Sequence, residues 1–134
     1  MAVVLDSDAV VGFLDRDDAL HTAADTAIRD VIGEHRILIS AVTYTEVFTA
    51  ARLGHHDEAA VGGFFAELTS AILPVDVAVA DRAAELRSRL RSLRMPDALI
   101  LASADTEAGV QLIVTGDQQM AKVSGLSCAV RLLG

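Results

Sequence analysis

The chain has 134 residues, of which 52% are hydrophobic, and a formal net charge of −8 at pH 7. This length fits one domain with a core of its own, and the composition excludes a disordered tail or a membrane-spanning run of roughly 18 apolar residues. The acidic balance also argues against a protein that binds nucleic acid through a broad basic surface.

Apolar strand-like runs alternate with helical patterns along the whole chain. Strands are predicted at 2–6, 37–40, 72–76, 110–117 and 126–133. Helices are predicted directly after Asp6 and at 21–35, 40–54, 57–70, 79–93 and 96–109, with Gly54 near the end of one and Pro96 in the first turn of another. Such alternation predicts one α/β domain over residues 1–134, a three-layer α/β/α sandwich with a central, mostly parallel sheet.

Two carboxylates, Asp6 and Asp8, follow directly on the first apolar run. Asp6 could be a helix cap or turn residue, but Asp8 is the better candidate for capping, which leaves Asp6 harder to explain. Asp117 also ends a predicted strand. In open parallel sheets ligands bind beyond the carboxyl ends of the strands, so Asp6 and Asp117 are expected at one edge of the sheet.

Glu46 has two interpretations that depend on where its helix begins. The segment TYTE at 43–46 matches a capping box, in which Glu46 would bond back to the amide of Thr43. Ser40 is an equally good cap, and in that case Glu46 lies in the second turn beside apolar residues, where a carboxylate needs a partner.

Asp97 and Asp117 each have an ordinary structural explanation. Asp97 follows Pro96 in a first helical turn, where an acid complements the helix dipole, and Asp117 follows Gly116 in what reads as a turn. Together with Asp6 and Glu46, however, these acids fall at matching places in successive strand–helix units. Hard oxygen ligands grouped in this way suit Mg²⁺ or Mn²⁺.

Three stretches carry a resemblance to a known family: VVLDSDAVVGFLD, ISAVTYTEVFTAARLG and MPDALILASADTEAGVQLIVTGD. With the closing strand they cover essentially the whole chain. The sequence resembles PIN-domain proteins, and most of all the VapC-type toxin ribonucleases of bacterial toxin–antitoxin pairs. The third stretch is the most specific, because a Pro-Asp-Ala-Leu-Ile helix start is followed by a glycine and a strand that ends in Thr-x-Asp.

The resemblance implies an endoribonuclease that hydrolyses RNA phosphodiesters with Mg²⁺ or Mn²⁺, forms a homodimer and is silenced by a cognate antitoxin. It implies an acidic quartet and two small hydroxyl residues near the metal-bound water or the scissile phosphate. The quartet is Asp6, Glu46, Asp97 and Asp117, and the hydroxyl residues are Ser7 and Thr115. We expect the three aspartates to supply most contacts of the metal, directly or through its waters, and Glu46 to orient a water or hold a second ion. Without metal, at least one carboxyl pKa is expected to rise.

Two positions depart from the family pattern. Asp8 stands where an uncharged polar residue is common, so it either adds charge near the site or only caps the helix. The segment QQM at 118–120 stands where charged residues and then phenylalanine are common, which affects expectations about substrate contacts but not about the metal site.

The basic residues qualify the acidic net charge. All except Lys122 are arginine, and five lie in one short stretch. Some of them can pair with Glu67 or Glu85 on a solvated helix face, whereas others can contact RNA phosphates. The candidates for RNA contact are Arg87, Arg91 and Arg94, with Arg94 best placed because it directly precedes the helix that carries Asp97.

The remaining chemistry-bearing residues have structural explanations. The pair His55 and His56 reads as an exposed turn, because adjacent residues point to different sides. Cys128 is the only cysteine, which excludes an internal disulfide and a cysteine-based zinc cluster. With no basic region or cleavage site at the N-terminus, a secretory signal is not expected and a cytoplasmic setting is. Aliphatic surface at 41–53 and 58–70 could serve a partner.

Two other functions compete with the nuclease. The segments LDSDAV and VTGDQQ fit a haloacid-dehalogenase-like phosphatase, but that fold needs a lysine between the two motifs, and Lys122 follows both. The second acid expected beyond Asp117 is absent, since position 121 is alanine. A non-catalytic PIN-type module that binds RNA or protein is the other alternative, which the presence of all four acids disfavours.

Overall fold

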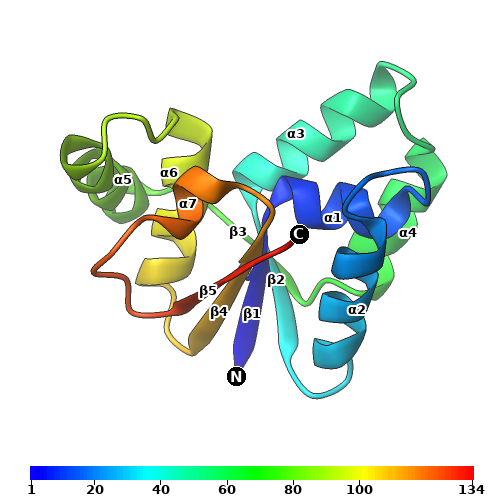
Figure 1. The fold of residues 1–134 in the computed structure, drawn as a ribbon, viewed down its shortest axis with the longest axis horizontal. Helices are drawn as coiled ribbons and strands as arrows, with labels where there is room; N and C mark the ends of the chain where they lie inside the picture. The colour runs from blue at the N-terminus through cyan, green and yellow to red at the C-terminus, as the bar shows by residue number, and fades with distance from the viewer.

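A five-stranded, all-parallel sheet with strand order β3-β2-β1-β4-β5 forms the middle layer of the computed structural model, which describes residues 1–134 (Figure 1). The strands are β1 (Ala2–Leu5), β2 (Arg36–Ser40), β3 (Ala71–Leu73), β4 (Val110–Thr115) and β5 (Ala129–Leu132). The helices are α1 (Ser7–Leu14), α2 (His21–Val31), α3 (Ala41–Arg52), α4 (Glu58–Glu67), α5 (Val77–Arg89), α6 (Met95–Thr106) and α7 (Gln118–Ala121). The predicted three-layer α/β/α sandwich is confirmed.

Two hydrophobic clusters cover the two faces of the sheet, and β1 contributes to both. Val3 and Leu5 pack with buried residues of α1, α2, α3 and α4, whereas Ala2 and Val4 pack with those of α5 and α6. Side chains along a strand point alternately to opposite faces, so a strand buried on both faces is apolar throughout. This burial explains why β1 reads as a continuous apolar run.

A bulge in β4 changes which of its residues face each layer. Ala2 pairs with Val110, but Val3 pairs with Leu112, so Gln111 is an extra residue on the β4 side. As a result Val110 and Ile113 belong to the same cluster, although they are three residues apart. The shifted register pairs Leu5 with Val114, and therefore brings the residues after β1 level with the end of β4.

The order of the strands fixes where a site can form. From β1 the chain adds β2 and β3 on one side of the sheet and then returns to place β4 on the other side. In open α/β sheets such a reversal leaves a crevice at the carboxyl ends of the two central strands. Here these strands are β1 and β4, which end at Leu5 and Thr115.

Element boundaries differ from the predictions in places where long-range contacts decide them. The last strand is shorter than predicted and begins at Ala129, and α5 begins at Val77 because Asp76 caps it through the N–H of Val79. The short helix α7 was not predicted and replaces the expected turn after β4. No helix combines the length and the apolar character that crossing a bilayer requires.

One ion pair ties the C-terminal loop to the helices beneath it. Arg82 Nε donates to Asp105 Oδ2 over 2.6 Å, and the N–H of Ser127 donates to Asp105 Oδ1 over 2.6 Å. Burial opposes the ionisation of Asp105, but these hydrogen bonds outweigh it and the pKa of Asp105 is lowered. Arg82 also contacts Glu85, as predicted for the arginine stretch, although Glu85 is more exposed than Asp105.

Replacing Asp105 by alanine should lower the free energy of unfolding by about 2–4 kcal/mol, because it removes charged hydrogen bonds from a mostly buried site. Glu85→Ala, which removes the exposed partner of the same arginine, should cost at most about 1 kcal/mol. Urea unfolding measures both values. Since the pKa of Asp105 is lowered, the gap between Asp105→Ala and wild type should shrink as the pH falls below the ordinary value of 3.8. Equal losses in the two variants would contradict this.

Candidate active site

Asp6 and Asp117 lie at the carboxyl ends of the two central strands and cap the helices that follow. Asp6 Oδ1 accepts the N–H of Ser7 over 2.7 Å, and Asp117 Oδ1 accepts the N–H of Gln119 over 2.7 Å. Asp6 therefore has the capping role that was one of its structural explanations, whereas Asp117 caps a helix where the sequence predicted a turn. Each cap uses the Oδ1 atom of its residue.

Thr115 joins these two aspartates through its hydroxyl group. Its Oγ1 donates to Asp6 Oδ2 over 2.7 Å and accepts the N–H of Asp117 over 3.0 Å. Thr115 is fully buried, so this geometry is held by packing as well as by hydrogen bonds. The observed role of Thr115 is to fix the relative positions of Asp6 and Asp117.

Glu46 reaches the same edge of the sheet from α3. Ser40 caps this helix by accepting the N–H of Val42 over 3.1 Å, so the capping-box interpretation that began at Thr43 is wrong. Glu46 lies in the second turn, and its Oε1 accepts the Ser7 hydroxyl over 2.6 Å. Ser7 therefore positions Glu46 beside Asp6, although the two acids are forty residues apart in the sequence.

Asp97 is the third residue of α6, after Pro96 in the first turn as predicted. Its side chain is only 7% exposed, and Oδ2 accepts the Nε of Arg94 over 3.1 Å. Burial raises the pKa of Asp97, Arg94 opposes this rise, and the nearby Asp117 adds to it. Asp117 is thus close enough to influence the ionisation of Asp97.

Asp6 is the most perturbed carboxyl group in the chain. Burial, and then the negative charge of Asp8, raise the pKa of Asp6 from 3.8 to about 8, against hydrogen bonds from Thr115 and Ser7. The expectation that at least one carboxyl pKa would rise is confirmed. A strongly raised pKa in a hollow marks a group that lacks a compensating cation.

Asp8 does not cap α1, and that prediction is wrong because Asp6 takes the capping position. Instead, Asp8 Oδ1 accepts the N–H of Gly116 over 3.0 Å and so anchors the turn between β4 and α7. A methyl group on Gly116 would lie 2.8 Å from Asp8 Oδ2 and would collide with Leu20 Cδ1. Glycine is needed here for space, since the turn packs directly on α1.

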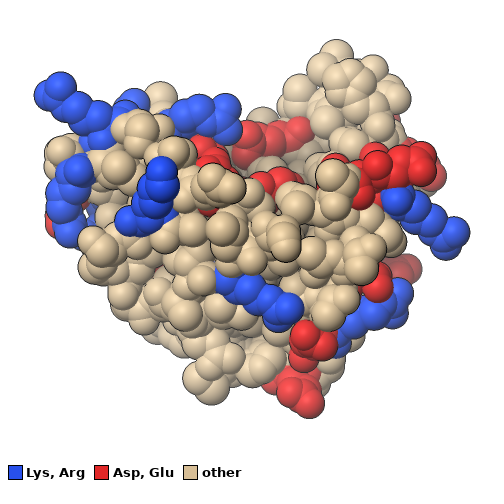
Figure 2. All heavy atoms as spheres, in the orientation of Figure 1, with Lys and Arg blue, Asp and Glu red and all other residues tan.

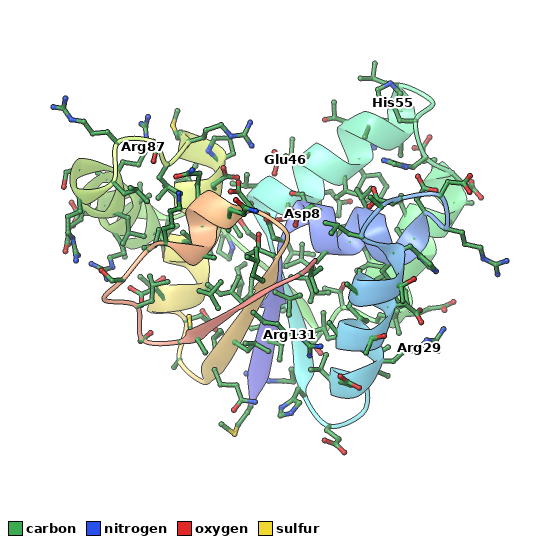
Figure 3. The ribbon with its side chains drawn as sticks, viewed as in Figure 1. Asp8, Arg29, Glu46, His55, Arg87 and Arg131 are labelled. Carbon is green, nitrogen blue, oxygen red and sulfur yellow. The ribbon has the colours of Figure 1, made fainter.

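The acids line an open hollow and do not form a closed cage. Figure 2 shows acidic side chains in the depression between the α3 side and the α5–α6 side, and Figure 3 places Glu46 and Asp8 near it. No three His, Cys, Asp or Glu side chains stand close enough to hold an ion by themselves. The interacting pairs are Asp6 with Asp8 and Asp97 with Asp117. Carboxylate pairs of this kind fit a hard divalent ion that keeps several waters and takes few protein ligands.

The predicted RNA-contacting arginines have three different environments. Arg87 donates its Nε to the carbonyl of Leu93 over 3.1 Å and so supports the turn between α5 and α6. Arg94 pairs with Asp97, a contact that was not predicted, and Arg91 makes no hydrogen bond or ion pair. Basic side chains gather over the α5–α6 side in Figure 2, beside the acidic hollow. The spacing of three residues between Arg94 and Asp97 on a helix was the signal available in the sequence.

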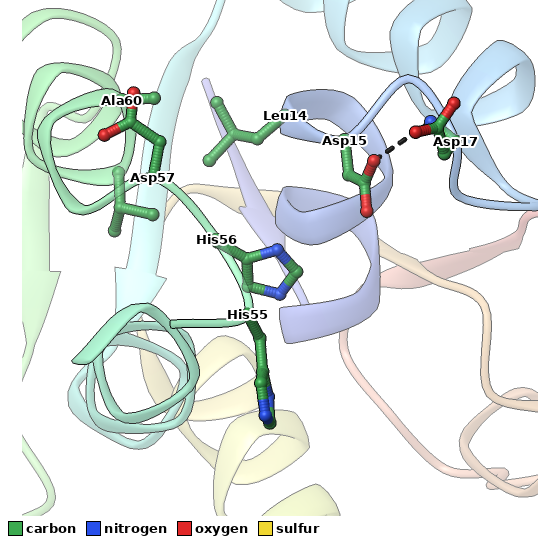
Figure 4. A pocket seen from close by; sticks show the side chains of 8 residues that line it. Leu14, Asp15, Asp17, His55, His56, Asp57 and Ala60 are labelled. Atoms are coloured by element: carbon green, nitrogen blue, oxygen red, sulfur yellow. Dashed lines mark hydrogen bonds between the residues drawn. The ribbon is translucent and has the colours of Figure 1, made fainter. Parts of the chain in front are cut away.

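His55 and His56 lie away from these acids, in the turn after α3. They line a cavity of about 320 Å³ beside Leu14 and Asp15, and their rings point in different directions (Figure 4). Cys128 is half-buried just before β5, and burial raises its thiol pKa. Neither feature contributes to the acidic site.

The fold and the site together describe an α/β sandwich with carboxylates gathered at the reversal point of its parallel sheet. A family model described as the PIN domain matches residues 3–126, and the chain belongs to this family. This membership leaves the haloacid-dehalogenase alternative without support.

Solved structures with the same fold include several toxin–antitoxin proteins. VapBC2 from Rickettsia felis, bound to a DNA fragment from its promoter, has a TM-score of 0.77, 14% identity and 100% coverage of both chains. VapC20 from Mycobacterium tuberculosis, a sarcin–ricin-loop-cleaving toxin, has a TM-score of 0.70 and 18% sequence identity, with 89% of this chain and 92% of that chain covered. A toxin–antitoxin complex from Klebsiella pneumoniae has a TM-score of 0.71 and 22% sequence identity, with 90% of this chain and 92% of that chain covered. No curated protein matched the chain by sequence.

Gly116→Ala should destabilise the protein by about 1–3 kcal/mol, because the added methyl group overpacks the contact with Asp8 and Leu20. The matched control is Gly62→Ala in α4, where the methyl group meets no atom within 4 Å and should stabilise the helix by about 0.4–1 kcal/mol. Chemical denaturation measures both. Similar effects in the two variants would show that the β4–α7 turn is not tightly packed on α1.

Asp6→Asn should stabilise the metal-free protein, and the gain should grow as the pH rises from about 4 to 8. The reason is that the folded pKa of Asp6, about 8, lies above its ordinary value of 3.8, so ionisation opposes folding across this interval. Thermal unfolding in a chelator at several pH values measures the trend. Asp81→Asn is the control, because it makes the same change at an exposed acid of α5 and removes no buried charge. If Asp6→Asn stabilised the protein by the same amount at all pH values, the raised pKa of Asp6 would be contradicted.

Proposed function

We propose that this PIN-domain protein is a divalent-metal-dependent endoribonuclease and the toxin of a toxin–antitoxin pair. The observation that carries the proposal is the buried Asp6 at the reversal point of the sheet, whose pKa is raised to about 8 beside Asp8 and which Thr115 links to Asp117. An acidic site with a single nearby cation gains most from an added positive charge. Family membership and the toxin–antitoxin neighbours support the reaction class.

Asp6, Asp97 and Asp117 would hold Mg²⁺ or Mn²⁺ partly through its bound waters, since no three acids lie close enough to ligate it by themselves. Glu46 would orient a water or hold a second ion. When bound, such an ion lowers the pKa of a coordinated water and relieves charge on the phosphate oxygens. Thr115 keeps Asp6 and Asp117 in place, and Ser7 holds Glu46 toward them. Asp8 anchors the Gly116 turn, which keeps Asp117 level with Asp6.

RNA would lie across the acidic hollow, with its phosphates toward the arginines of the α5–α6 side. This orientation puts the exposed Arg91 and Arg94 next to the backbone, where arginines supply sequence-independent affinity. Arg87 serves mainly the turn before α6, so its contribution to RNA binding would be smaller.

The partners in this proposal are a cognate antitoxin and a second copy of the chain. Two of the similar structures are complexes by their own descriptions, VapBC2 and the Klebsiella pneumoniae complex. On this chain, Tyr44 of α3 is 39% exposed and Leu53, the C-cap of that helix, is 68% exposed, which gives this region apolar surface suited to association. A cytoplasmic setting remains a prediction from the cysteine usage.

Asp6→Asn should lower RNA cleavage at least about 100-fold, since changes even in the residues that support metal ligands cost 10- to 100-fold. The test compares cleavage of a mixed RNA panel in Mg²⁺, in Mn²⁺ and in a chelator, for wild type, Asp6→Asn and Asp81→Asn. Chelation should abolish wild-type cleavage, whereas Asp81→Asn should behave as wild type. Cleavage by Asp6→Asn at the wild-type rate, or full activity in chelator, would overturn the proposal.

A further inference from the structure

We propose that Arg94 has two positions in the reaction: it is the counterion of Asp97 in the metal-free protein, and it moves to an RNA phosphate when the acids hold a divalent cation. This inference rests on the proposed function and deepens it. It makes Arg94 a substrate-contacting residue that also sets the affinity of the site for metal.

The two partners of the Arg94–Asp97 ion pair differ strongly in their exposure to solvent. Asp97 is 7% exposed at its side chain, whereas the side chain of Arg94 is 71% exposed, and the single bond joins Nε to Oδ2 at 3.1 Å. Arg94 makes no other side-chain hydrogen bond or ion pair. Its two terminal nitrogens are therefore free to bind a second partner while the side chain stays over the acidic hollow.

Arg94 is also the only basic side chain paired with any of the site acids. Asp6, Asp8, Glu46 and Asp117 form no ion pair, although the charges of Asp117 and Glu46 reach Arg94 as well. A single guanidinium thus balances a group of carboxylates of which two are buried. Neutralisation of these carboxylates by another cation would remove most of what holds Arg94 in place.

The neighbouring arginines show that this arrangement is particular to Arg94. Arg87 donates Nε to the carbonyl of Leu93, and Arg89 pairs with Glu85 on the outer face of α5. Neither of these bonds involves a site acid, so neither would change when the site gains charge. Arg94 directly precedes α6 and lies beside Asp97, so a released Arg94 would stay next to the acids, where a phosphate would approach.

The test measures Mn²⁺ binding by titration calorimetry and RNA cleavage in parallel, for wild type, Arg94→Gln, Arg94→Lys and Arg89→Gln. Removing a positive charge several ångströms from a divalent ion in a solvated site should tighten Mn²⁺ binding by roughly three- to tenfold in Arg94→Gln. The same variant should lose at least about tenfold in kcat/KM for RNA, because a phosphate contact is gone. Arg94→Lys keeps the charge, so its Mn²⁺ affinity should stay near that of wild type.

Arg89→Gln is the matched control, since it makes the same charge change and breaks a pair remote from the acids, and it should leave Mn²⁺ affinity within about twofold. Thermal unfolding checks that every variant is folded. Unchanged or weaker Mn²⁺ binding in Arg94→Gln overturns the counterion position, and unchanged RNA cleavage overturns the phosphate contact. Absence of Mn²⁺ binding in folded wild type would instead refute the proposed function itself, and this inference with it.

Discussion

The hydrogen bond from Thr115 to Asp6 is the contact on which the rest of the site depends. It joins the ends of β1 and β4, the two strands that meet where the chain reverses direction across the sheet. Because Thr115 also accepts the N–H of Asp117, one hydroxyl orders two carboxyl groups from opposite ends of the sequence. The partners of Thr115 are fixed by the register of the sheet, so the site is as rigid as the core.

This rigidity is maintained against a clear electrostatic cost. Asp6 is buried and next to Asp8, and Asp97 is buried next to Asp117. A protein selected only for stability would replace one member of each pair with a neutral residue. The structure instead supports Asp6 with hydrogen bonds from the Ser7 N–H and the Thr115 hydroxyl, which lower its pKa against burial and hold its oxygens in fixed directions.

The fold could be predicted from the sequence because each βα unit has local signals, namely an apolar run, a capping residue and an amphipathic helix. The sequence was also sufficient to place Asp6 and Asp117 at one edge. It could not decide between Ser40 and Thr43 as the start of α3, because both caps are locally satisfactory and only the end of β2 selects one. Contacts between residues far apart in the chain could not be predicted from these local signals.

Asp8 shows most clearly why local pattern was not enough. The sequence favoured Asp8 as the cap of α1, but its carboxylate instead accepts the N–H of Gly116, which lies more than a hundred residues later in the chain. For the contact between Arg94 and Asp97, both residues and their spacing of three were visible in the sequence. The sequence did not show that Asp97 is buried while Arg94 is exposed, and this difference leaves Arg94 free to bind a second partner. Exposure is a property of the folded chain and cannot be read from spacing.

The extra residue in β4 has a consequence for how this chain can vary. Because Gln111 is an extra residue in β4, the side chains of Val110, Ile113 and Thr115 all point to the face of the sheet that α6 covers. Deleting any one residue between the bulge and Thr115 would send that hydroxyl to the opposite layer, away from Asp6. The length of this strand is therefore constrained, because its residue count decides which layer the Thr115 hydroxyl faces.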